Sequence, residues 1–157
     1  MAEARYVPAL RFRALTALYD PLIRLTTRET EFKRRLLAEA ELKPGERVLD
    51  LACGTGTLAI MAKRAEPKAE VIGLDGDLEI LRRARQKADE AGTEIGLDQG
   101  LSTELPYPDH AFDTVLSTLF FHHLTLPAKQ QTAREIARVR SPAGASASPT
   151  GDGRGTR

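Results

Sequence analysis

The chain has 157 residues, a formal net charge of +1 at pH 7 and 41% hydrophobic residues, so its length suits one compact domain with a single buried core. A charge this close to zero, with acidic and basic residues interleaved along the chain, argues against a protein that coats nucleic acid. The single cysteine, Cys53, excludes a disulfide framework, and without paired cysteines or histidines at zinc spacing we expect no bound metal.

Residues 5–43 predict an amphipathic helical arm, because leucines recur there at steps of three and four residues. Pro21 is expected to divide this region into two helices, since proline is tolerated in a first turn but breaks a helix interior. Pro44 and Gly45 end the helical pattern. We therefore assign residues 1–45 to an N-terminal helical arm.

From residue 46 onward, short apolar runs alternate with segments of helical periodicity. The runs are typical of buried parallel strands and cover 48–51, 71–74, 95–97 and 112–119. Helices are expected over 57–65, from the N-cap Asp77 to Gly92, and from Pro127 to Val139. This alternation predicts an α/β fold with a Rossmann-like, doubly wound parallel sheet, incomplete at about four strands.

The segment 141–157 differs in kind, because it contains no Leu, Ile, Val or aromatic residue. Such a segment cannot bury enough apolar surface to offset the entropy lost on ordering, so we expect a disordered tail. The predicted α/β domain thus covers residues 46–140.

The strongest motif is VLDLACGTGTLA, in which a strand ends at Asp50, a loop of small residues follows and a helix begins near Gly56. Small residues let a ligand approach the backbone closely, and the start of a helix offers free N–H donors. Asp75 closes the next strand, where a carboxylate can accept hydrogen bonds from the two hydroxyls of a ribose. The motif therefore predicts a nucleotide-containing ligand.

The string GTGTLA also fits the loose dinucleotide pattern GxGxxA, so an NAD-dependent oxidoreductase is an alternative. Two features argue against it. First, Asp50 would repel the pyrophosphate of a dinucleotide, although it could pair with a cationic amino group. Second, a long helical arm precedes the strand, whereas dinucleotide domains usually begin with it.

Beyond these motifs, the sequence resembles class I S-adenosylmethionine-dependent methyltransferases in VLDLACGTGTLA, in VIGLDGD with its Asp75, and in LPYPDHAFDTVLSTLFFHHL. It is most similar to the ubiquinone/menaquinone-biosynthesis branch, in which the arm before the first strand resembles the one that carries Tyr19 and Asp20 here. The similarity covers residues 10–140. The resemblance implies a methyltransferase that uses S-adenosylmethionine as cofactor. It leaves the small-molecule acceptor open, with quinone-like and lipid-like compounds both compatible.

The resemblance also implies which residues bind the cofactor. Asp50 would be aimed at the ammonium group of the methionine moiety, Asp75 would take both ribose hydroxyls, and Gly76 would pass beneath the adenine. Five further positions would border the methionine moiety, namely Ala52, Gly54, Thr55, Gly56 and Thr118. Leu101 and Ser102 would border the edge of the adenine.

Two of these positions depart from the family pattern. Many relatives have a glycine where Ala52 stands, and many have Asp or Asn where Leu101 stands, to bond the adenine amino group. Leu101 cannot make that bond, so Ser102 or backbone groups would have to.

The resemblance assigns no catalytic residue. A methyl group on a sulfonium is already activated, so transfer needs mainly alignment and the exclusion of water. His122 and His123 are the candidates for a general base, and as neighbours at a strand end only one of them could face the pocket. We interpret Cys53 as a small residue that fits the turn rather than as a nucleophile.

At the C-terminal end, relatives continue with a turn, a fifth strand and a hairpin, whereas here the segment 134–139 leads directly into the predicted tail. We therefore expect the C-terminal strands to be missing, and a reading-frame shift after codon 140 would account for this. The alternative function is a non-catalytic, truncated methyltransferase-like protein that at most binds the cofactor.

The expected partner is a small-molecule methyl acceptor, with no nucleic acid and no integral membrane segment, and the oligomeric state stays open. No apolar run reaches the length of a membrane span, and no hydrophobic signal core with a cleavage site is found. We therefore expect a cytoplasmic protein.

Overall fold

The computed structural model describes residues 27–118 and 121–142, and the chain divides into two units, residues 1–36 and 37–157. In the described part of the predicted arm, a helix covers residues 27–40. The predicted break at Pro21 and most of the predicted tail lie outside the described residues.

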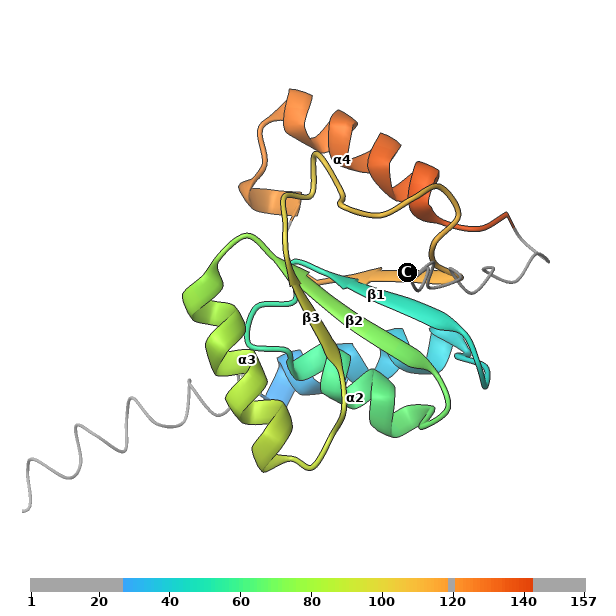
Figure 1. The fold of residues 1–157 in the computed structure, drawn as a ribbon, viewed down its shortest axis with the longest axis vertical. Coiled ribbons are helices and arrows are strands. Elements are labelled where there is room, and N and C mark those ends of the chain that lie inside the picture. Colours follow the sequence, from blue (N-terminus) through green and yellow to red (C-terminus); the bar gives the residue numbers. More distant parts are fainter. Residues whose placement is uncertain (1–26, 119–120, 143–157) are drawn as a thin grey trace, which may run out of the picture. The chain divides into compact units, whose positions relative to one another are not determined.

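Within the described residues, the second unit contains a sheet of four parallel strands in the order β3-β2-β1-β4 (Figure 1). The strands are β1 (Arg47–Leu51), β2 (Glu70–Asp75), β3 (Gly96–Gln99) and β4 (Thr114–Ser117). Each strand pairs with its neighbour in parallel register. The predicted α/β parallel sheet is confirmed.

In the described part of this unit, three α-helices and one short 3₁₀ helix connect the strands or follow them. They are α2 (Thr57–Ala65), α3 (Leu78–Glu90), η1 (Phe121–His123) and α4 (Leu126–Val139). Figure 1 shows α2 and α3 on one face of the sheet and α4 on the other, so the sheet is covered on both faces. None of the helices in the described parts combines the length and the apolar character needed to cross a bilayer.

The start of α3 confirms the predicted cap. The Asp77 carboxylate accepts hydrogen bonds from the backbone N–H groups of Glu79, at 2.8 Å, and Ile80, at 3.3 Å. These are donors that the helix itself cannot satisfy, and such a cap stabilises a helix by about 1 kcal/mol.

The apolar runs of the sequence form the core of the sheet. Leu49, Leu51 and Leu74 lie in one buried cluster with Phe112 and Val139. Burial of each such side chain contributes about 1.5–3 kcal/mol relative to its exposure to water. The cluster joins β1 and β2 to the region of α4.

The fourth strand is shorter than the predicted 112–119: β4 covers Thr114–Ser117. Phe112 pairs instead with the chain that leaves α4: its N–H donates to the carbonyl of Val139 at 3.0 Å, and its carbonyl accepts from the N–H of Ser141 at 2.7 Å. Ser141, the first residue of the predicted tail, is 6% exposed. The described chain after α4 is therefore packed against the edge of the sheet.

Candidate functional site

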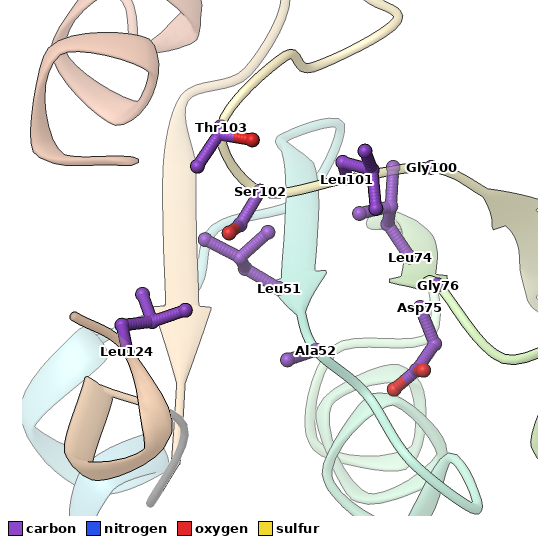
Figure 2. A pocket seen from close by; sticks show the side chains of 10 residues that line it. All are labelled: Leu51, Ala52, Leu74, Asp75, Gly76, Gly100, Leu101, Ser102, Thr103 and Leu124. Carbon is purple, nitrogen blue, oxygen red and sulfur yellow. The ribbon is translucent and has the colours of Figure 1, made fainter. Parts of the chain in front are cut away.

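A cavity of ≈ 370 Å³ opens at the carboxyl ends of β1 and β2 (Figure 2). Ligands in open α/β sheets bind at this end of the strands. Four leucines contribute apolar surface to it, and the remaining lining residues are small or polar: Ala52, Asp75, Gly76, Gly100, Ser102 and Thr103 beside Leu51, Leu74, Leu101 and Leu124. The volume falls within the range of small-molecule sites.

Five of the predicted cofactor residues line this cavity, namely Ala52, Asp75, Gly76, Leu101 and Ser102. The other five lie outside the lining, and they are Asp50, Gly54, Thr55, Gly56 and Thr118. Prediction from sequence missed the other five lining residues, which are Leu51, Leu74, Gly100, Thr103 and Leu124. For the three leucines the reason is that nothing in a single sequence separates a pocket-lining leucine from a core leucine.

The turn after β1 has an unusual backbone. Ala52, Gly54 and Gly56 all have positive φ angles, of 57°, 55° and 73°. Gly56 closes the turn by donating its N–H to the carbonyl of Cys53 at 2.9 Å, and its own carbonyl then starts α2 by accepting from Ile60. A Cβ on Gly56 would lie only 3.2 Å from the Cβ of Ala84, so the small residue lets α3 approach.

Asp75 joins the turn after β1 to the loop after β2. Its Oδ2 accepts a hydrogen bond from the N–H of Gly54 at 3.0 Å, and its Oδ1 accepts from the N–H of Asp77 at 3.0 Å. A carboxylate has about four acceptor sites, so each oxygen keeps room for a further donor. Asp75 can thus hold the turn and still bind two hydroxyl groups of a ligand.

Cys53 lies within the same turn but is not suited to nucleophilic chemistry. Its side chain is buried, and burial raises the pKa of the thiol to about 12, with the carboxylates of Asp50 and Asp75 acting in the same direction. A thiol that stays protonated is a poor nucleophile. The Sγ atom fills space beside Gly73, where an added Cβ would lie 2.8 Å from it.

Ser117 of β4 is a polar residue that was not predicted from the sequence as part of the site. Its Oγ is buried and has no hydrogen-bond partner among the described residues. The parallel register places Ser117 beside Leu51, which lines the cavity. A buried hydroxyl without a partner is destabilising, so Ser117 weakens the packing of β4 beside the cavity.

The two candidate bases are placed differently from the prediction. His122 and His123 lie in the 3₁₀ helix η1 rather than at a strand end, so the alternation of side chains along a strand does not apply to them. Both are exposed, and the next residue, Leu124, lines the cavity.

A family described as a methyltransferase domain matches residues 48–144 of the chain. Among curated proteins, the demethylmenaquinone methyltransferase of Thermus thermophilus is 37% identical over 135 residues, which cover 85% of this chain and 60% of the relative. The corresponding protein of Lactobacillus johnsonii is 36% identical over 138 residues, which cover 85% and 56%. The chain thus spans little more than half the length of these relatives.

The fold is also similar to solved structures. The crystal structure of a SAM dependent methyltransferase from Aquifex aeolicus matches with a TM-score of 0.61 and 26% sequence identity. The match covers 70% of this chain and 58% of that one.

Proposed function

Because this chain belongs to the methyltransferase domain family, whose cofactor is S-adenosylmethionine, we propose that it transfers a methyl group from S-adenosylmethionine to a small-molecule acceptor. The observation that carries the proposal is the cavity at the ends of β1 and β2, with the Asp75 carboxylate at its edge. The similarity to known proteins supports membership of the methyltransferase family, whereas the roles of individual residues are our proposal.

The residues of the cavity fit the nucleoside part of this cofactor. Asp75 can accept hydrogen bonds from both ribose hydroxyls while it keeps its two backbone donors. Leu74 and Leu101 offer apolar surface to a flat base, and Gly76, which also lines the cavity, has no side chain to take up space beside it. Ser102 or backbone groups would serve the polar edge of the base.

The turn after β1 fits the amino-acid part. We propose that the methionine moiety lies along Ala52, Gly54, Thr55 and Gly56, with Asp50 and Thr118 at the same end. The start of α2 directly after Gly56 supports this placement, because the first backbone N–H groups of a helix have no partner within it and can face an anionic carboxylate.

When bound, the cofactor supplies a methyl group that the positive charge on sulfur has already activated. The task of the chain is then to bind, to orient and to exclude water, and the apolar walls of the cavity serve the last of these. His122 and His123 remain our candidates for a base, which is needed only if the acceptor loses a proton during attack.

For the acceptor we propose a quinone-like compound. The support is twofold: the relatives are named demethylmenaquinone methyltransferases, and Leu51 and Leu124 give the cavity an apolar wall beside η1. An aromatic ring system binds to such a wall by burial of apolar surface.

The first test is thermal unfolding of the purified chain with S-adenosylhomocysteine, the product form of the cofactor, and with NAD as the control. A ligand that binds only the folded state raises the unfolding midpoint, so we expect a rise with S-adenosylhomocysteine alone. A rise with NAD alone would favour an oxidoreductase. Binding without methyl transfer to a demethylated quinone would favour the non-catalytic alternative.

The role of Asp75 is tested by Asp75→Asn, with Asp89→Asn as the matched control on the exposed side of α3. We expect Asp75→Asn to weaken binding of S-adenosylhomocysteine by about 10-fold or more, because hydrogen bonds to a charged group contribute about 1.5–3 kcal/mol. Asp89→Asn should leave the affinity unchanged. Equal affinities in calorimetry would contradict the proposed ribose site.

A further inference from the structure

The segment between β3 and β4 forms one wall of the cavity. Gly100, Leu101, Ser102 and Thr103 all line it. Within the segment, one isolated bridge pairs Leu101 with Glu104. The position of this wall therefore depends on what holds the segment from outside.

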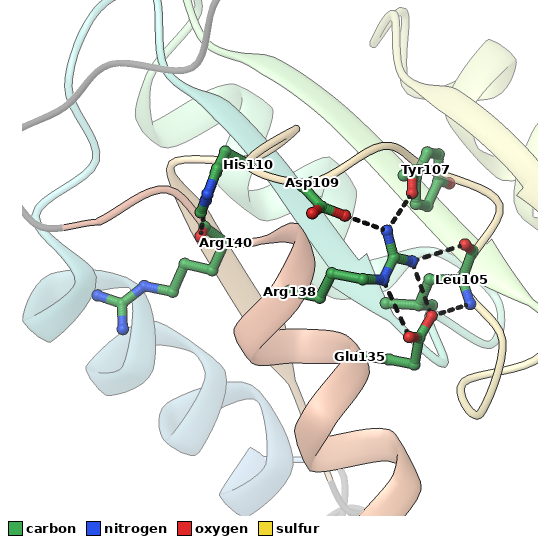
Figure 3. A network of polar contacts seen from close by, with 7 residues as sticks. All are labelled: Leu105, Tyr107, Asp109, His110, Glu135, Arg138 and Arg140. Atoms are coloured by element: carbon green, nitrogen blue, oxygen red, sulfur yellow. Dashed lines mark hydrogen bonds and ion pairs between the residues drawn. The ribbon is translucent and has the colours of Figure 1, made fainter.

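Arg138 of α4 holds the segment at three points (Figure 3). Its Nη1 donates to the carbonyl of Tyr107 at 2.7 Å and to the carboxylate of Asp109 at 3.0 Å, and its Nη2 donates to the carbonyl of Leu105 at 3.1 Å. The planar fork of a guanidinium can satisfy such divergent acceptors at once, whereas an ammonium group offers no such fixed geometry.

Glu135 completes this contact. Its Oε2 accepts a hydrogen bond from the N–H of Leu105 at 2.7 Å and another from Nη2 of Arg138 at 2.8 Å. The hydrogen bonds from Arg138 are the main reason that the pKa of Glu135 lies below its usual value, with the N–H of Leu105 acting in the same direction. Both polar groups of the Leu105 backbone are thus held by one pair of side chains.

A third contact comes from the same face of α4. The hydroxyls of Thr132 and Ser102 lie 3.0 Å apart, and both side chains are buried. Residues spaced three apart on a helix are neighbours on one face, so Thr132, Glu135 and Arg138 act on the segment together. Ser102, which this face holds directly, lines the cavity.

We propose that Glu135 and Arg138 are positioning residues for the cofactor site. Without touching the ligand, they hold the chain at Leu105, two residues after the wall formed by residues 100–103, and so set the affinity for the base and ribose of the cofactor. This inference rests on the proposed function. If the two residues had a purely structural role, their replacement would lower the stability of the fold and leave the affinity of the folded protein for the cofactor unchanged.

The test measures binding of S-adenosylhomocysteine by calorimetry, well below the unfolding midpoint of each variant. The variants are Arg138→Lys and Glu135→Ala, with Glu135→Gln as the conservative replacement that keeps an acceptor for the N–H of Leu105. Arg134→Lys, an exposed arginine on the same helix, is the matched control. Thr132→Val, which replaces the hydroxyl that contacts Ser102 with a methyl group, serves if the other variants do not fold, and its dissociation constant should also rise.

We expect the dissociation constant to rise about 5- to 10-fold in Arg138→Lys and Glu135→Ala, the usual size for residues that act on a site from a distance. Glu135→Gln should recover part of the loss, and Arg134→Lys should match the wild type. A lower unfolding midpoint with an unchanged dissociation constant would overturn the inference. Failure of the wild type itself to bind would overturn the proposed function, and the inference with it.

Discussion

Ala52 holds a backbone conformation that glycine adopts more readily. Its φ of 57° lies in the left-handed region, which costs a residue with a Cβ about 1–2 kcal/mol. We predict that Ala52→Gly raises the free energy of unfolding by about 0.5–1 kcal/mol, since the relief exceeds the added entropy of the unfolded chain. Urea unfolding measures this.

The control for that variant is Ala59→Gly in the buried interior of α2, where φ is helical and the same change should cost about 1 kcal/mol. If both variants lose stability to the same extent, the strain assigned to Ala52 is absent.

Cys53 should be inert in the folded protein. Its pKa of about 12 keeps it protonated at neutral pH, so a disulfide reagent should label it only after unfolding. An unfolded cysteine titrates at about 8.5, so its contribution to stability is present below that pH and is lost as the pH rises toward 12.

Cys53→Ala should therefore lose less stability than the wild type across that alkaline range. Rapid labelling of the native thiol at neutral pH would contradict the prediction.

At this scale the sequence predicted Asp75, because a carboxylate at the end of a strand suits a ribose, and the family resemblance added Ala52, Gly76, Leu101 and Ser102, whereas Gly100 and Thr103 were missed. It could not predict Leu51 or Leu124, whose apolar side chains read as core. It also misplaced His122 and His123, because the turn of the chain into a 3₁₀ helix after β4 leaves no mark in the hydrophobic pattern.

At the scale of elements, α4 binds the segment between β3 and β4 through Glu135, whose side chain is 13% exposed. The lowered pKa of Glu135 makes this contact sensitive to acid. An unfolded glutamate titrates at about 4.3, so the contribution to stability is complete above that pH and is lost as the pH falls through the native pKa.

We predict that Glu135→Gln is less stable than the wild type at neutral pH and that the difference shrinks below about pH 4. Urea midpoints across this range measure it. A difference that stays constant with pH would show that the charge of Glu135 contributes nothing.

The elements themselves were largely readable from the sequence. The helix over 57–65 and the Asp77 cap were predicted as found, because proline, glycine and capping residues mark helix ends locally. The predicted start of the fourth strand at residue 112 was wrong, since Phe112 pairs with the chain after α4, a partner distant in sequence that no local pattern reveals.

For the whole molecule, the order of the sheet sets where the fold opens first. In the described residues, β1 and β2 each have a paired strand on both sides, whereas β3 and β4 lie at the two edges. We predict that the amides of β1 and β2 exchange with solvent most slowly, because they open only when much of the sheet does.

Hydrogen exchange with mass spectrometry tests this order. Addition of S-adenosylhomocysteine should slow exchange further in residues 51–56, 75–77 and 100–105. Exchange in the exposed middle of α3 should stay unchanged, so that α3 serves as the internal control. Exchange in β3 as slow as in β1 would contradict the predicted hierarchy.

The pairing of Phe112 with Val139 and Ser141 also bears on how the chain folds during synthesis. Phe112 is fully buried, and its two backbone partners belong to residues made about thirty positions later. Domains form as the chain emerges, and contacts distant in sequence form last. Until Ser141 has left the ribosome, Phe112 lacks these backbone partners, and before that it also lacks the side chains of Ile136 and Val139 that share its buried cluster, so we expect the nascent chain to expose an aromatic side chain to chaperones.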